Sequence, residues 1–188
     1  MCKKLSEMNL KELWQLFPIF LTEHNYRWED DYKEMEFLLK EKLSDCSIIR
    51  ISHIGSTAVK CIWAKPIIDI LVEIDTNENI EFSAQNIVNS GFIKMSETKN
   101  RMSFNYGYTV NGFAKKVYHL HLRYKGDNDE LYFRDYLNDY PQIAKEYEYL
   151  KLRLWHQYEH NRDMYTNKKS SFVNKYTKQA KNTYGNLY

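Results

Sequence analysis

Two apolar runs separated by a short polar loop constrain the fold of this chain more than any other feature. The segment 53–74 reads HIGSTAVKCIWAKPIIDILVEI; it breaks at Gly55-Ser56, and Lys65-Pro66 starts the second run. This pattern predicts strand, loop and strand. The second run, residues 66–74, hardly alternates between apolar and polar residues, which is typical of a strand buried on both faces.

Asp69 is the only acid within the apolar run 67–72. A carboxylate in such surroundings is costly unless it is paired, hydrogen-bonded or bound to a metal. Gly55 allows a backbone to approach a ligand closely, and Ser56 offers a hydroxyl and an N–H to the same ligand. We therefore expect a loop suited to phosphate oxygens beside a functional carboxylate.

The pattern of apolar residues predicts an α+β fold in which a mixed sheet is followed by helices. A chain of 188 residues with 43% hydrophobic content can bury the core of one domain. We expect a single domain, 1–188, with an α/β core over about 1–126 and a helical region over about 127–188 packed on it. The predicted helices are 10–16, 28–43, 77–90, 131–137, 141–160 and 166–184, and the predicted strands are 47–52, 66–74, 92–95, 101–108 and 117–124, with a hairpin turn at 111–112.

Several protein classes are excluded or disfavoured by what the sequence lacks. Cys2, Cys46 and Cys61 are odd in number and lack CxxC spacing, so neither a disulfide framework nor a zinc ribbon is indicated. We find no apolar run of membrane-spanning length and no signal-peptide pattern, and we expect a cytoplasmic protein without a membrane partner. P-loop and Rossmann glycine motifs are missing, and the HxxEH match at 156–160 lacks the downstream acid of a zinc protease.

Six blocks in order resemble the GrpB family, which is assigned to the nucleotidyltransferase superfamily of the polymerase-beta type. They are HIGSTAV (53–59), AKPIIDILVEI (64–74), HLHLR (119–123), LYFRDYLNDYP (131–141), AKEYEYLKLRL (144–154) and YTNKKSSFV (165–173). The resemblance runs from about residue 16 to the C-terminus. It implies a nucleotidyltransferase-like mixed sheet flanked by helices. In some bacteria a similar domain is fused to dephospho-coenzyme A kinase, which implies nucleotide or coenzyme A handling.

In that superfamily a Gly-Ser pair holds the β- and γ-phosphates, and two acids at alternate strand positions bind Mg²⁺. Gly55-Ser56 and Asp69 match this pattern, but Leu71 stands where the second acid belongs. Glu73 shares a face with Asp69 but lies about 13 Å along the strand, so this strand alone does not assemble a two-metal site. The resemblance implies Mg²⁺ or Mn²⁺ at Asp69, with Glu73 or a histidine as a further ligand.

His119 and His121 point to one face of the strand 117–124. Our hypothesis is that they replace the missing acids as catalytic, metal or phosphate contacts. The alternative is a pair of histidines hydrogen-bonded in a polar cleft without metal. The candidate phosphate ligands are His53, Gly55, Ser56, Thr57, Lys65, Arg101 and Lys168.

The sequence therefore predicts binding of a nucleoside triphosphate or a related phosphorylated small molecule. If the protein is an enzyme, the expected reaction is metal-dependent nucleotidyl transfer to an unknown acceptor. The alternative is a non-catalytic nucleotide-binding or partner-regulating module that has lost the metal-binding acid pair. A third interpretation, RNA binding, rests on the last helical segment, where six basic residues and one acid follow His160.

Overall fold

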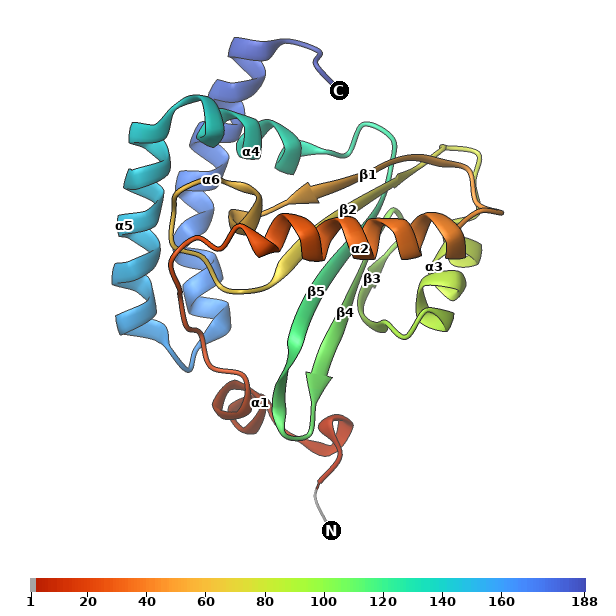
Figure 1. The fold of residues 1–188 in the computed structure, drawn as a ribbon, viewed down its shortest axis with the longest axis horizontal. Coiled ribbons are helices and arrows are strands. Elements are labelled where there is room, and N and C mark those ends of the chain that lie inside the picture. The colour runs from red at the N-terminus through yellow and green to blue at the C-terminus, as the bar shows by residue number, and fades with distance from the viewer. Residues whose placement is uncertain (1–2) are drawn as a thin grey trace.

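A five-stranded mixed sheet lies at the centre of the computed structural model, which describes residues 3–188 (Figure 1). Cys2 lies outside the described residues. The strand order is β1-β2-β5-β4-β3; β2 and β5 are parallel, and the other neighbours are antiparallel. The strands are β1 Ile48–Ile54, β2 Ile68–Ile74, β3 Ile93–Thr98, β4 Arg101–Thr109 and β5 Gly112–Tyr124.

All six predicted helices are present. They are α1 Leu10–Leu16, α2 Arg27–Lys42, α3 Ile80–Asn89, α4 Asp129–Asp139, α5 Pro141–Tyr158 and α6 Arg162–Tyr184. Local sequence explains several of their starts: Asn9 and Asn79 accept a backbone hydrogen bond as N-caps, and Pro141 occupies the first turn of α5. The last helix begins four residues earlier than the sequence pattern predicts, at Arg162, and this difference affects the site.

Helices α2 and α3 cover one face of the sheet. Strand alternation turns one set of β2 side chains, Ile68, Ile70, Val72 and Ile74, into the core beneath these helices. The prediction that Ile80, Ala84 and Ile87 of α3 face inward is confirmed. The same prediction for Val88 is wrong, because Val88 is exposed.

The opposite face of the sheet carries polar side chains and meets the C-terminal helices. Asp69 and Glu73 project there from β2, and Leu71 between them packs against Leu131 of α4. In Figure 1, α4 crosses one end of the sheet, and α5 and α6 run side by side beyond it. The loop after β1 is anchored to these helices, because Val59 and Ile62 pack into one cluster with Leu137, Ala144 and Tyr147.

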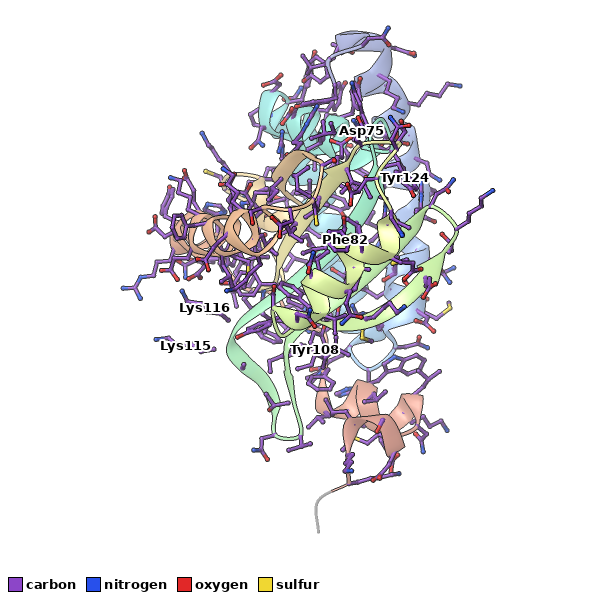
Figure 2. All side chains as sticks on the ribbon, turned by 90° about the vertical axis from the view of Figure 1, so that its right-hand side faces the viewer. Asp75, Phe82, Tyr108, Lys115, Lys116 and Tyr124 are labelled. Atoms are coloured by element: carbon purple, nitrogen blue, oxygen red, sulfur yellow. The ribbon has the colours of Figure 1, made fainter. Side chains whose placement is uncertain are left out.

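The β4–β5 hairpin extends beyond the rest of the sheet. In the view of Figure 2, Tyr108 of β4 lies toward the lower part of the sheet and Tyr124 of β5 toward its upper part. The predicted hairpin is present, but its two turn residues are Val110 and Asn111, one position before the prediction, because Gly112 already begins β5. Phe17, just after α1, packs against Tyr108 with ring centroids 4.7 Å apart. No helix in residues 3–188 combines the length and the apolar character needed to cross a membrane.

Candidate anion-binding site

The structure brings Gly55 and Asp69 together. Ile54, the last residue of β1, pairs with Asp69 of β2, so the chain turns at Gly55 directly beside the carboxylate. Gly55 has a φ of 72°, and a Cβ atom on it would come within 2.9 Å of the Asp69 Cβ and closer still to Oδ2. A glycine is therefore required twice at this position, for its backbone conformation and for its lack of a side chain.

A hydrogen-bonded chain runs from Asp69 across β5 to β4. His119 Nδ1 lies 3.2 Å from Asp69 Oδ1, and His119 Nε2 lies 2.8 Å from the Tyr108 hydroxyl oxygen. Because an ionised carboxylate only accepts hydrogen bonds, Nδ1 carries the proton and Nε2 accepts from Tyr108. Asp69 thus sets the tautomer of His119.

His121 is held by two protein groups. Its Nε2 lies 3.8 Å from Asp69 Oδ1, and its Nδ1 lies 3.4 Å from Arg123 Nη2. Since a guanidinium only donates, Nδ1 of His121 is an acceptor and Nε2–H faces Asp69. His119 and His121 therefore flank one carboxylate oxygen from the same side of the sheet.

These contacts keep Asp69 ionised, and burial keeps His119 neutral. Burial alone would raise the pKa of Asp69, but the contacts with His119 and His121 outweigh it and hold that pKa below its ordinary value. Burial lowers the pKa of His119; Asp69 opposes this shift, whereas Arg162 and Lys65 add to it. At neutral pH the pair is a carboxylate beside a neutral imidazole.

A cavity of about 160 Å³ opens between the Gly55 turn, β5 and the last two helices. Among residues 3–188, four cationic side chains line it, and Asp69 is its only acid. Ser56 and Thr57 of the loop also line it, as does His119. The four cations are Lys65, Lys151, Arg162 and Lys169.

The four cations come from three parts of the chain. Lys65 precedes β2, Lys151 belongs to α5, and Arg162 and Lys169 lie two turns apart on α6. Within residues 3–188, none of them lies within 4.0 Å of a carboxylate oxygen. Their contacts are instead with neutral groups. Arg162 lies 3.4 Å from the Tyr108 hydroxyl, Lys151 donates to the Trp63 carbonyl, and Lys169 stands over the Tyr165 ring.

Burial, reinforced by neighbouring like charges, weakens the protonation of these lysines. Burial, with Arg162 and Lys169 nearby, lowers the pKa of Lys65 to about 7. Burial and Lys169 lower the pKa of Lys151 to about 7, and burial with Arg162 lowers that of Lys169 to about 8. We call this cavity, in which one carboxylate faces four cationic side chains, the cationic pocket.

A second cavity of about 320 Å³ adjoins the first and shares Ser56 and Asp69 with it. Its walls are largely apolar, with the rings of Phe133 and Tyr147 in T-shaped contact at 5.2 Å. Polar groups from α4 and α6 also line it, namely Asp129, Glu130, Arg134, Asn174 and Thr177. Ser56 and Asp69 therefore stand at the junction between a cationic pocket and a larger, mainly apolar one.

The prediction that His53 contacts phosphate needs correction. His53 pairs with Ile70, so it lies on the α2 face of the sheet, where its ring stacks on Tyr32 with centroids 4.8 Å apart. Its Nε2 lies 2.9 Å from Thr57 Oγ1, and Thr57 in turn donates to the Ile67 carbonyl. Since the only hydroxyl proton of Thr57 goes to Ile67, His53 must donate. His53 orients Thr57 from outside the cavity.

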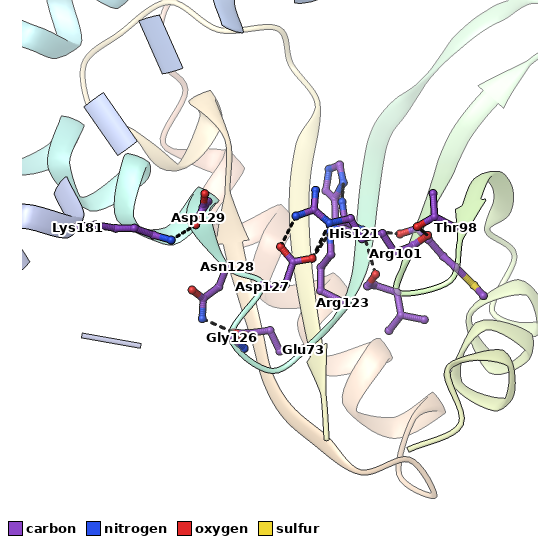
Figure 3. Close-up of polar contacts among 12 residues, drawn as sticks. Glu73, Thr98, Arg101, His121, Arg123, Gly126, Asp127, Asn128, Asp129 and Lys181 are labelled. Atoms are coloured by element: carbon purple, nitrogen blue, oxygen red, sulfur yellow. Dashed lines mark hydrogen bonds and ion pairs between the residues drawn. The ribbon is translucent and has the colours of Figure 1, made fainter. Parts of the chain in front are cut away.

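Glu73 is placed away from the site, which corrects its assignment as a metal ligand. It is fully buried and lies 3.2 Å from Arg50 Nε. Its Oε1 accepts hydrogen bonds of 3.0 Å from the Gly126 N–H and from Asn128 (Figure 3). These contacts tie the turn before α4 to the sheet, and neither cavity is lined by Glu73.

Arg101 and Lys168 are likewise absent from both cavities. Figure 3 shows Arg101 paired with Asp127, and both of its donor atoms lie 2.6 Å from carboxylate oxygens. This bidentate pair satisfies the guanidinium that was expected to bind phosphate. Lys168 is exposed, because one residue along α6 turns a side chain by about 100° away from Lys169.

Lys151, Arg162 and Lys169 were missed as site residues, although their spacing carries a signal. Arg162 and Lys169 are seven residues apart on one helix face, with buried Tyr165 between them. Lys151 follows Tyr147 by four residues and so interrupts the apolar stripe of α5. A cation on the buried stripe of a helix indicates a function beyond solubility.

The donor atoms around Asp69 do not fit Mg²⁺, and Mn²⁺, which also favours carboxylate oxygens, would find a single carboxylate among the described residues of the pocket. Mg²⁺ requires near-octahedral coordination by oxygen, whereas Asp69 is the only carboxylate of the cationic pocket and its Oδ1 already faces two imidazoles. In the part of the chain that the structure describes, no three or more His, Cys, Asp and Glu side chains are grouped to hold a metal ion. The HxxEH match at 156–160 forms no metal site either.

Comparison with known proteins finds relatives that match most of the chain. A family model described as GrpB protein matches residues 18–179. Glutamate-rich protein GrpB of Alkalihalophilus pseudofirmus is 34% identical over 170 residues, covering 82% of this chain and 91% of that protein. The crystal structure of the conserved protein GrpB from Enterococcus faecalis is similar with a TM-score of 0.75 and 29% identity, over 88% of this chain and 99% of that chain.

A more distant solved structure bears on the fold. The Cid1 poly(U) polymerase, crystallised as a mutant bound to MgATP, is similar with a TM-score of 0.52 at 11% identity. The match covers 79% of this chain and 46% of that chain. At this identity the similarity concerns the fold alone, and the predicted nucleotidyltransferase-like fold is confirmed.

Proposed function

The chain belongs to the GrpB family, and we propose that it binds a nucleoside triphosphate or a related phosphorylated small molecule. The phosphates occupy the cationic pocket. The observation that carries the proposal is the convergence of Lys65, Lys151, Arg162 and Lys169 on one cavity, in which Asp69 is the only acid among the described residues. Their charges are incompletely balanced by the protein, and an anion supplies the missing balance.

The polar groups of the cavity suit phosphate oxygens. Arg162 offers a planar set of donors, and the lysines act as point charges. Ser56 adds a hydroxyl donor at the turn, where Gly55 keeps the backbone accessible. Bound phosphate stabilises the protonated lysines, so the pocket gains charge as it fills.

The larger cavity suits the organic part of the same ligand. It meets the cationic pocket at Ser56 and Asp69, and the rings of Phe133 and Tyr147 form part of its wall. Apolar walls with a few polar groups are typical of small-molecule sites. The polar edge formed by Glu130, Asn174 and Thr177 supplies hydrogen-bonding groups for a base or sugar.

Nucleotidyl transfer to an unknown acceptor is the second candidate function. It is favoured by the fold shared with Cid1 and by the Asp69–His119 pair, whose neutral imidazole can accept a proton at Nε2 from an acceptor hydroxyl that takes the place of the Tyr108 hydroxyl. The acceptor oxygen would attack the α-phosphorus while pyrophosphate leaves, its charge neutralised by the cations. The competing interpretation is a binding module without turnover.

Nucleotide binding is tested by titrating ATP, GTP, CTP, UTP and coenzyme A precursors against the wild-type protein and Arg162→Gln. We expect micromolar to millimolar binding of at least one ligand, weakened about tenfold in the variant. Lys178→Gln, on an exposed part of the same helix, is the matched control and should bind as wild type does. Binding that is absent, or that is equal in all three proteins, contradicts the proposal.

Turnover is tested separately from binding. Each α-labelled nucleoside triphosphate is incubated with the protein and a cell extract, and label transfer to any acceptor is measured. Transfer that is lost in His119→Gln supports the enzyme interpretation. Binding without transfer under these conditions supports the module.

A further inference from the structure

We propose that the cationic pocket takes its phosphorylated ligand as a metal-free anion, with lysine and arginine side chains neutralising the charge that a divalent ion would otherwise carry. This inference rests on the proposed function and concerns the same pocket. It differs from the metal-dependent site that the fold implies.

The first support is what surrounds the Asp69 carboxylate. Asp69 Oδ1 lies 3.2 Å from His119 Nδ1 and 3.8 Å from His121 Nε2. Its Oδ2 lies against the Gly55 backbone, in the space that a Cβ would need. A divalent ion on Oδ1 would have to displace the two imidazoles, and an ion on either oxygen would find no second carboxylate among the described residues of the cationic pocket.

The second support is the number and placement of the cations. Four cationic side chains against one carboxylate give a formal excess of 4 − 1 = +3 when all are charged. A magnesium ion added to that set would face like charges, since Arg162 and Lys65 lie close enough to His119 to lower its pKa. A bound pyrophosphate would favour this fully charged state, because its negative charge stabilises the protonated lysines.

The third support is that the cations lie on elements fixed by packing. Lys151 is 2% exposed and donates to the Trp63 carbonyl, while Tyr165 is buried one turn before Lys169. Arg162 is held near Tyr108 and His119 at 3.4 Å from each. The positive charges are therefore held in position before the ligand binds.

The inference predicts how magnesium affects binding. Mg²⁺ coordinates the same phosphate oxygens that the lysines and Arg162 would contact, and it cancels two charges of the ligand. Added Mg²⁺ should therefore compete with the pocket for the ligand. A pocket that required the ion would show the opposite dependence.

The test is isothermal titration of inorganic pyrophosphate into the full chain, first with EDTA and then with excess MgCl₂ at matched ionic strength. We expect binding in EDTA, weakened about threefold or more by Mg²⁺ because ligand charge is lost. Lys169→Gln and Arg162→Gln should each weaken the EDTA affinity about tenfold. Lys168→Gln, the exposed neighbour, should leave it unchanged.

Each outcome decides something different. Binding that requires Mg²⁺ overturns the metal-free inference but leaves the proposed function intact. Failure of pyrophosphate to bind in either condition overturns the inference; if nucleotides also fail to bind, the proposed function falls as well. Equal affinities for the Lys169 and Lys168 variants place the anion elsewhere and overturn the inference. Thermal melting of each variant shows that it is folded.

Discussion

The Asp69 carboxylate occupies the space that a side chain on Gly55 would fill. A Cβ on Gly55 would lie 2.9 Å from the Asp69 Cβ, and the backbone there has a φ of 72°. The turn and the carboxylate are consequently packed against each other at the junction of the two cavities. This packing orients Ser56 and His119 toward the proposed phosphate position.

Gly55→Ala should destabilise the protein and abolish ligand binding. The collision with Asp69 adds to the strain of a positive φ, and we expect a loss of about 3 kcal/mol or more. Gly126→Ala is the matched control, since Gly126 has a φ of 89° with nothing within 4 Å of its Cβ position. It should lose only about 1 kcal/mol. Equal losses in urea denaturation would show that the contact with Asp69 is unimportant.

Glu73→Gln should reduce stability without changing phosphate affinity. Glu73 is buried, and the substitution leaves Arg50 without its partner, which costs about 3 kcal/mol. Glu97→Gln, which breaks an exposed pair with Lys94, should leave stability nearly unchanged because water screens that pair. Denaturation and pyrophosphate titration of both variants check this. A loss of affinity with stability preserved would restore Glu73 as a ligand.

Stability should fall as the pH is lowered from 6.5 to 4. Burial lowers the pKa of His53 to about 4, with Asp69 opposing and Arg134 reinforcing the shift. The unfolded chain protonates this histidine near pH 6.5, whereas the folded chain does not, so the unfolded state gains a proton first. The full effect is about 3 kcal/mol. His119 acts in the same direction.

His53→Gln isolates that contribution, because the amide can still donate to Thr57. Unfolding free energies measured at several pH values should decline less steeply for the variant between pH 6.5 and 4. Parallel curves for the two proteins would show that His53 titrates normally in the folded state.

Pyrophosphate binding should take up protons near pH 8. The pKa values of Lys65 and Lys151 are about 7 and that of Lys169 is about 8, and a bound anion raises all three. The complex then holds more protons than the free protein, so affinity falls as the pH rises through this window. Calorimetry in two buffers of different ionisation enthalpy measures the uptake. Because pyrophosphate itself titrates, the decisive quantity is the difference between wild type and Lys169→Gln, and no difference would contradict the account.

The part of the site that lies within one short stretch could be predicted from the sequence. Gly55 and Asp69 are joined by a single strand-loop-strand unit, so local pattern was sufficient to bring them together. The alternation of β5 likewise predicted that His119 and His121 share a face. The prediction that His53 contacts phosphate was wrong because adjacent residues of a strand face opposite sides of the sheet. In β1 it is Ile54 that pairs with Asp69, so His53 lies on the other face.

Helical periodicity alone could not assign the cations of α5 and α6 to the site. A helical stripe shows which residues share a face, but not which face meets the sheet. The earlier start of α6 brings Arg162 into the helix and puts it in line with Lys169 rather than Lys168. Arg101 was misassigned for a related reason: its partner Asp127 lies 26 residues away in sequence.

The most direct test of the account is a crystal structure of the protein grown with pyrophosphate in EDTA. The account predicts density for the anion between Arg162, Lys169 and the Ser56-Thr57 turn, within hydrogen-bonding distance of Arg162 and with no metal ion beside Asp69. An empty pocket with the anion bound elsewhere, or a divalent ion held by Asp69, would contradict it.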